Sequence, residues 1–315
     1  DISGDIDIDG TSNLDAVDVD GAVNFAADVT YAAGAEIVTA SAGTSNFRAG
    51  VNAGDAIESG GNYNTVVGDE AGTAITTGDT NVGVGRAALR DCTTGGNNSA
   101  LGDNAINAVT TGGYNVGIGN SAGSSGVGLT TGSQNVIVGD YSHTSANDSA
   151  NQIVMGYNVV GSGNGTITVG NATTDSTMTL GGTTWSAPSD LRYKKNIADS
   201  TAGLSFINDL RPITFEWKNE GDLPEGHNAR VEGSTTPYNN PNTNHGFVAQ
   251  EVKTAIDNHS EIKDGFRMWS EDEADDRQRV GEGYLVPMLV KAIQELSAKV
   301  EELESQPVCK CKGGE

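Results

Sequence analysis

The sequence Asn81-Val82-Gly83-Val84-Gly85-Arg86-Ala87-Ala88 is one copy of a short repeat that decides the fold of the first half of this chain. In every copy a glycine follows the asparagine by four residues, and in all but the last an alanine follows it by seven. The copies begin 17 to 20 residues apart, at Asn46, Asn64, Asn81, Asn98, Asn115 and Asn135. A fixed period this short predicts stacked coils, none of which can bury its apolar face alone.

Within one copy, Val82 and Val84 alternate with a small residue, which predicts a short strand whose valines point into a narrow interior. A Thr-Thr-Gly triplet precedes four of the copies and predicts a turn, because glycine adopts backbone conformations that other residues resist. Aromatic residues are scarce in this region. We therefore expect several chains to wind or stack together and share one core.

The repeat of residues 46–140 resembles the left-handed β-roll heads of trimeric adhesins and the shafts of bacteriophage tail fibres. That resemblance implies a trimeric β-roll or triple β-helix. Alternating apolar and acidic residues predict a strand-rich shaft segment at residues 1–45, and weaker spacing marks the end of the shaft at 141–188. The chain begins with Asp1 and lacks an apolar leader, which indicates a piece of a longer protein with an N-terminal anchor elsewhere.

The composition changes at Ser189-Asp190-Leu191-Arg192-Tyr193-Lys194-Lys195-Asn196-Ile197. Only three basic residues, Arg48, Arg86 and Arg90, precede this stretch, and an ordinary globular composition follows it. A serine five residues before a lysine fits a Ser-Lys dyad, in which a neutral lysine takes the proton of the hydroxyl. That spacing is common by chance. The alternative interpretation is an exposed lysine that lies near a serine in a turn.

The string Ser-Asp-x-Arg-x-Lys-x-Asn-Ile resembles the entry motif of the endosialidase-type intramolecular chaperone, the self-cleaving C-terminal domain of phage tailspikes and tail fibres. Further matching strings follow in the same order at residues 210–218, 245–252 and 284–289. The resemblance implies a small α+β chaperone domain at 189–284 and assembly as a homotrimer.

The same resemblance implies roles for single residues. Ser189 matches the nucleophile and Lys194 the general base, and the cut falls between Pro188 and Ser189. Asp190, Arg192 and Asn196 complete the motif and are expected to hold the site in shape. His245 either approaches the dyad or serves packing and hydrogen bonding.

The last predicted element is a coiled-coil helix at 285–306, followed by a flexible tail at 307–315. Its apolar residues follow a 3, 4 spacing, at Val286, Leu289, Ile293, Leu296, Val300 and Leu303. β-branched residues at one seam position and leucine at the other favour two strands by the usual rule, whereas the family resemblance implies three. We follow the family, because fewer than three heptads are too short to set the number of strands.

Charge and composition exclude several functions. The net charge of -24 opposes contact with a phosphate backbone, so we expect no nucleic-acid partner. No apolar run approaches the ~20 residues of a spanning helix, and we expect no membrane insertion. The three cysteines lack a framework spacing, and the calcium-loop-like start at residues 5–10 has Ala16 where the last ligand should be glutamate. We therefore expect no metal and no cofactor.

The resulting expectation is a trimeric phage tail fibre or tailspike whose C-terminal domain aligns the chains and then cuts itself off in a single turnover. The shaft would belong to the virion tail, with other tail proteins and a host receptor or glycan as partners, and the chaperone domain would be released in the host cytoplasm. A purely structural fibre with a permanent C-terminal cap is the alternative. A surface autotransporter would need a C-terminal membrane barrel, and no carboxylate pair singles out a glycan-cleaving site.

Overall fold

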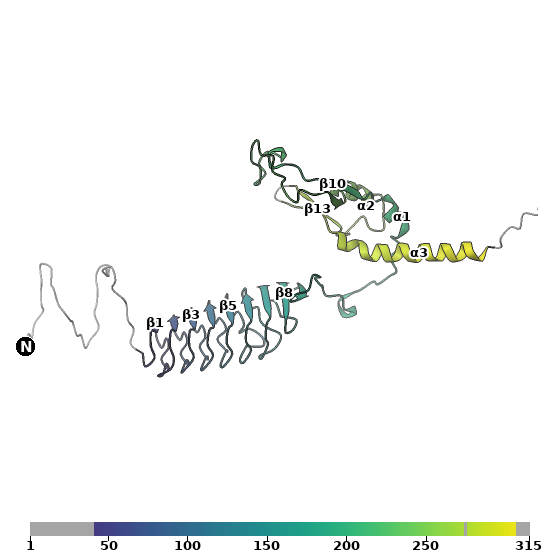
Figure 1. Cartoon of the computed structure of the whole chain (residues 1–315). Helices are drawn as coiled ribbons and strands as arrows, with labels where there is room; N and C mark the ends of the chain where they lie inside the picture. Colours follow the sequence, from purple (N-terminus) through teal and green to yellow (C-terminus); the bar gives the residue numbers. More distant parts are fainter. Residues whose placement is uncertain (1–40, 274–275, 307–315) are drawn as a thin grey trace, which may run out of the picture. The chain divides into compact units, whose positions relative to one another are not determined.

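The computed structural model describes residues 41–273 and 276–306, which form two compact units divided between Asp190 and Leu191. Figure 1 shows the β-stack of the first unit and the long helix α3 of the second. The strands predicted for residues 1–45 lie almost wholly outside the described residues. The calcium-loop-like stretch at 5–10 and the 307–315 tail lie outside them as well.

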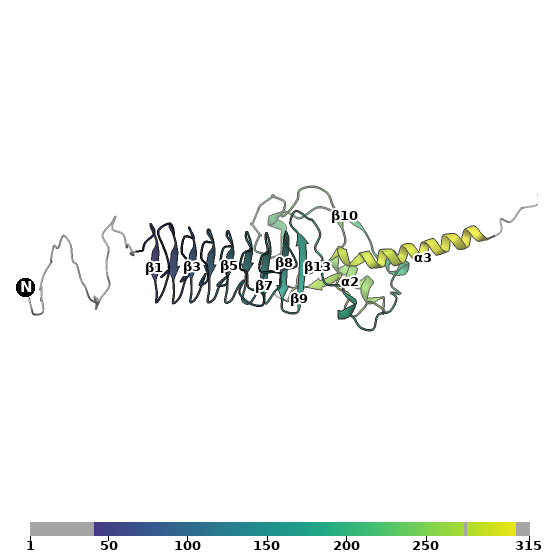
Figure 2. The same cartoon turned by 90° about the horizontal axis from the view of Figure 1, so that it is seen from below.

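The first unit is a β-solenoid with one strand in each coil, which confirms a mainly β shaft built from short repeats. Strands β1 to β8 lie side by side in sequence order and pair in parallel, as Figure 2 shows. Strand β9 turns back antiparallel to β8 and ends the stack. The strands are β1 Phe47–Ala49, β2 Thr65–Val67, β3 Val82–Val84, β4 Ser99–Leu101, β5 Val116–Ile118, β6 Val136–Val138, β7 Ile153–Tyr157, β8 Thr166–Asn171 and β9 Thr174–Thr179.

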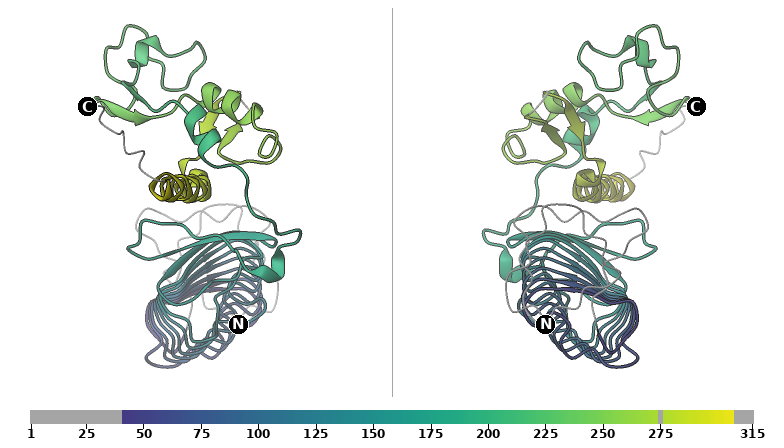
Figure 3. Two further views of the ribbon diagram at one scale, coloured as in Figure 1. Left: turned by 90° about the vertical axis from the view of Figure 1, so that its right-hand side faces the viewer. Right: turned by 90° about the vertical axis from the view of Figure 1, so that its left-hand side faces the viewer.

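Equivalent positions of successive repeats pair directly, so that Val84 lies opposite Leu101 and Leu101 opposite Ile118. Seen along the solenoid axis, the coils superimpose on one another (Figure 3). Each repeat residue therefore belongs to a column that runs along the stack, with a spacing of about 4.8 Å between neighbours.

The direction of the strand side chains differs from our expectation. Middle residues of the strands point inward, as Val66, Ala100 and Ile137 show with exposures of 0–1%. The flanking Val82, by contrast, is 41% exposed. The expectation that the alternating valines point inward was wrong, because the repeat asparagine takes the inward place and strand alternation then turns the next residue outward.

These asparagines form a ladder through the interior. Asn98 donates from Nδ2 to Oδ1 of Asn81 at 3.2 Å and to the carbonyl of Gly112 at 2.9 Å. Its own Oδ1 accepts the backbone N–H of Asn115 at 3.0 Å and the Asn115 side chain at 3.1 Å. The side chains of the ladder are fully buried from Asn64 to Asn135. Among the described residues every buried side-chain nitrogen or oxygen has a partner, so the polar interior is satisfied.

We expect Asn98→Ala to lower the free energy of unfolding of the solenoid by about 3 kcal/mol, because each buried group left without a partner costs about 1–3 kcal/mol. The carbonyl of Gly112 and the N–H of Asn115 lose their partners in this variant. Urea unfolding followed by circular dichroism measures the loss. The exposed Thr94→Ala is the matched control, and an equal effect of both variants would contradict a special role for the ladder.

A single chain supplies the whole core of each coil. The core residues between Ala53 and Val159 are buried without any neighbouring chain, so the expectation of a core shared between chains was wrong. Isoleucine, leucine, valine and alanine side chains fill the narrow interior together with the asparagine ladder, and aromatic residues are not needed. Close stacking also explains the corner glycine: Gly85 has a φ of +129°, and a Cβ there would lie 2.4 Å from the carbonyl oxygen of Gly102.

The second unit is a small α+β fold, as expected, with two antiparallel strand pairs, β10–β11 and β12–β13, among its described residues. Its elements are η1 Leu191–Tyr193, α1 Leu204–Asp209, β10 Ile213–Phe215, η2 Glu220–Asp222, β11 Asn244–Gly246, α2 Ala249–Asp257, β12 Trp269–Glu271, β13 Gln278–Val280, η3 Glu282–Leu285 and α3 Val286–Ser305. No helix in the described part of the chain has the length and apolar character needed to cross a membrane.

The core of this unit surrounds Phe206 of α1, which is fully buried against Val252 and Ile256 of α2 and against Met288 of α3. Helix α3 is tied to α1 by Glu295, whose Oε2 accepts the backbone N–H of Leu204 at 2.9 Å. A carboxylate at a helix N-terminus is favoured by the helix dipole. Helix α3 thus buries one face within its own chain.

His259 follows α2 and is only 8% exposed, with its ring 5.4 Å from that of Phe206. Its Nε2 lies 2.8 Å from Oδ2 of Asp209, and its Nδ1 lies 3.2 Å from Oε1 of Glu261. The hydrogen bond to Asp209 raises the pKa of His259, with further help from Glu261 and against the effect of burial. The pKa of Glu261 is lowered by its own backbone N–H and by His259.

A raised histidine pKa stabilises the fold fully below the ordinary value of about 6.5, and this stability is lost as pH rises through the folded pKa. The lowered pKa of Glu261 acts in the other direction and loses its contribution only in acid. We expect the second unit to be most stable in mildly acidic solution and His259→Gln to flatten the fall toward alkaline pH. Denaturant unfolding of both proteins across this range measures it, and parallel curves would contradict the role of His259.

Candidate active site

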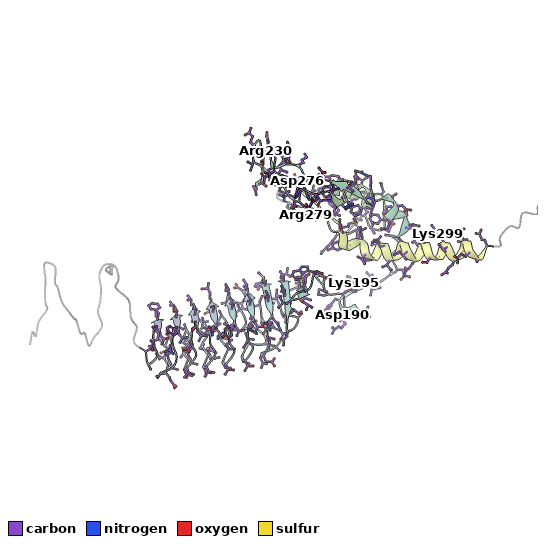
Figure 4. The ribbon with its side chains drawn as sticks, viewed as in Figure 1. Asp190, Lys195, Arg230, Asp276, Arg279 and Lys299 are labelled. Atoms are coloured by element: carbon purple, nitrogen blue, oxygen red, sulfur yellow. The ribbon has the colours of Figure 1, made fainter. Side chains whose placement is uncertain are left out.

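The predicted site residues lie on one exposed segment. The short helix η1 follows Asp190, and the backbone N–H of Lys194 donates to the carbonyl of Leu191 at 3.1 Å. Asn196 has a φ of +54°, the left-handed conformation that asparagine tolerates well. All residues from 181 to 201 are exposed. Figure 4 labels Asp190 and Lys195, which bracket η1 on this segment.

A Ser-Lys dyad requires a lysine that is kept neutral, and removal from water is the usual cause of such a neutral lysine. The exposed segment does not bury Lys194 in the single chain. Ser189 belongs to the first compact unit and Lys194 to the second, because the division falls after Asp190. The roles of both residues, and those of Asp190, Arg192 and Asn196, therefore stay predictions.

Large apolar side chains alternate with the polar residues of the motif. Leu191, Tyr193 and Ile197 are 72%, 77% and 64% exposed. Three large apolar side chains are thus exposed to water within seven residues. Covering these side chains would also take the intervening Lys194 out of water, so the chemistry that the motif requires depends on what covers the segment.

The structure brings the two downstream motifs together. Strand β10, from the string at 210–218, pairs with β11, so that Thr214 lies opposite His245. Arg211 then forms a two-pronged ion pair with Glu251 of α2, with Nε–Oε2 at 3.0 Å and Nη2–Oε1 at 2.6 Å. The string at 210–218 thus contains strand β10, the string at 245–252 leads into helix α2, and the Arg211–Glu251 pair links the two. His245 is exposed on β11.

One feature was not predicted from the sequence. A shallow cavity of about 270 Å³ lies beside Trp269 and is lined by the basic residues Lys253, Lys263 and Arg267. Lys253 Nζ stands 5.2 Å from the centre of the Trp269 ring. Residues 253–269 hold three basic and three acidic residues, so the sequence carries no charge signal that could have located it. Across residues 41–273 and 276–306 no group of three His, Cys, Asp or Glu side chains could hold a metal ion.

Comparison with known proteins gives one match. The model of the family described as chaperone of endosialidase, Peptidase_S74, matches residues 189–261, which is less than a quarter of the chain. No curated protein and no solved structure matches the chain. The family match begins at Ser189, the residue placed directly after the predicted cut. A segment that matches the chaperone-of-endosialidase family thus follows the β-solenoid in the sequence.

Proposed function

We propose that residues 189–306 form an intramolecular chaperone that gathers copies of this chain, aligns their solenoids and is then severed from them between Pro188 and Ser189. The observation that carries the proposal is the family match, which begins at the residue expected to become the new N-terminus. The solenoid would then be the mature part of a phage tail fibre or tailspike in the virion tail.

The apolar seam of α3 supports assembly. The seam residues point away from the chain's own core and are 42–66% exposed: Val286, Leu289, Ile293, Leu296, Val300 and Leu303. Met288 and Ala292, on another face of the helix, are buried against the rest of the unit. A helix that is packed on one side and carries a heptad stripe on another is suited to pairing with the same helix of other copies. The number three comes from the family resemblance.

The chemistry of the cut follows from the two residues that match the family's dyad. Lys194, once neutral, takes the proton of the Ser189 hydroxyl, and Oγ attacks the carbonyl carbon of Pro188. The bond from that carbon to the Ser189 nitrogen breaks, and the nitrogen receives the proton from Lys194. Water hydrolyses the resulting ester. No proton or electron is left over, and no cofactor takes part.

An intramolecular chaperone of this kind would help because several β-solenoids are slow to assemble in register. Separate chains built from the same repeat can pair in several registers, and they must find the right one before stable contacts form, which makes assembly slow. A helix that gathers the chains first replaces this search by a local one. Removal of the helix afterwards leaves the shaft kinetically trapped, because the template for the reverse process has gone.

The test is a mass measurement of the expressed full chain, first in native and then in denaturing solution. The proposal expects an oligomer in the first measurement, with the released C-terminal fragment either still bound or gone, and fragments that end at Pro188 and begin at Ser189 in the second. An oligomer of intact chains would instead favour a permanent C-terminal cap on a structural fibre. A host receptor and other tail proteins remain proposed partners of the shaft.

A further inference from the structure

The outward positions of strands β1 to β8 form a continuous surface, here called the outer sheet face. It consists of two columns, one running from Phe47 to Ile167 and the other from Ala49 to Val169. Of the 16 positions only Thr65 and Ser99 are not apolar. Leu101, at the middle of the second column, is 53% exposed. The single chain thus leaves an apolar sheet face in water along its whole solenoid.

Charge indicates what covers this face. None of its 16 positions carries a charge. The rest of residues 1–188 is strongly acidic, with many acidic residues and only three basic ones. Two copies of an acidic shaft repel one another wherever their carboxylates meet. The outer sheet face is a strip free of carboxylates along which two such shafts can approach. A glycan is a poor occupant, because the face offers it two hydroxyls and otherwise hydrocarbon.

The repeat indicates a second copy as the occupant. The face has a period of about 4.8 Å along the axis, and a partner with the same period is complementary to it in every coil. Eight strands of about three residues give a face of roughly 35 by 10 Å. Apolar patches of about 300–600 Å² on soluble chains are often functional, whereas a stable interface buries about 800 Å² per partner. The face is therefore suited to holding copies that another element has already gathered.

We propose that the solenoids of neighbouring copies pack against one another through the outer sheet face, parallel and in register. This inference rests on the proposed assembly through α3, which raises the effective concentration of the faces. The return halves of the coils and the Thr-Thr-Gly turns then remain on the outside of the fibre. The strand side chains that point away from the core would then form the interface between neighbouring chains.

Cross-linking of the full chain tests the proposal. The background is Ser189→Ala, which keeps the chain whole, combined with Cys309→Ser and Cys311→Ser. Leu101→Cys places a thiol on the outer sheet face. Ala74→Cys is the matched control, since it lies half-exposed on the return half of its coil and outside the sheet. Both variants are treated with a short bis-maleimide and separated on a denaturing gel, and light scattering gives the oligomeric state.

We expect an oligomer in both variants and at least roughly tenfold more linked chains with Leu101→Cys, because thiols held together in an interface meet at an effective concentration in the millimolar range. An oligomer with equal or no linkage at the two positions would overturn this inference and leave the assembly through α3 intact. Single chains in light scattering would overturn the assembly itself and this inference with it.

Discussion

Replacing Ser189 by alanine should leave the chain whole after folding, whereas the wild type should separate into two fragments on a denaturing gel. Without Oγ no acyl transfer from Pro188 can begin, and loss of a catalytic nucleophile lowers rates by roughly 10³-fold or more. Ser186→Ala is the matched control, because this exposed serine lies three residues before Ser189. Fragments from Ser189→Ala would remove this serine from the mechanism.

Adjacent lysines allow an equally strict test of the base. Lys194→Arg keeps the positive charge but removes the base, because arginine stays protonated in proteins. We expect the arginine variant to remain uncut. Lys195→Arg makes the same change one residue later, where the family motif requires no particular residue, and should be cut like the wild type. Equal cleavage of the two variants would contradict the dyad.

Charges placed in the α3 seam should convert the assembly into single chains. Ile293→Asp with Leu296→Asp puts two carboxylates where neighbouring helices would bury 61% and 46% exposed apolar side chains. Burial of an unpaired charge costs several kcal/mol, so each carboxylate strongly opposes association of the helices. Light scattering of the intact chain measures the change. Gln294→Asp with Ala298→Asp adds the same residues at exposed positions outside the seam and should leave the assembly unchanged.

The same seam variant should also lose cleavage, which a denaturing gel reports. Lys194 and its apolar neighbours Tyr193 and Ile197 are exposed in the single chain, so the environment that a neutral lysine needs must come from other surfaces. Cleavage of dissociated chains at the normal rate would show that one chain builds the site unaided. If the variant loses both assembly and cleavage, the result would show that cleavage requires assembled chains.

Much of the fold could be predicted because its information is local. The Asn81-to-Ala88 pattern returns at a fixed period, and a period of 17 residues dictates one coil per repeat. The apolar seam of α3 could also be predicted, since a helix places residues three and four apart on one face. The candidate site was located by its resemblance to a family, because a serine and a lysine at this spacing carry little information alone.

The sequence by itself determined the repeat period, the strand-by-strand stacking, the position of Ser189 and the seam of α3. Only the tertiary structure decided which side of each strand faces inward, because the asparagine ladder and the alternating residues compete for one narrow interior. It also decided that a single chain closes its own core, that β9 reverses direction, and that His259 meets Asp209 across 50 residues. These features depend on groups that are distant in sequence, and their burial and pairing exist only once the chain has folded.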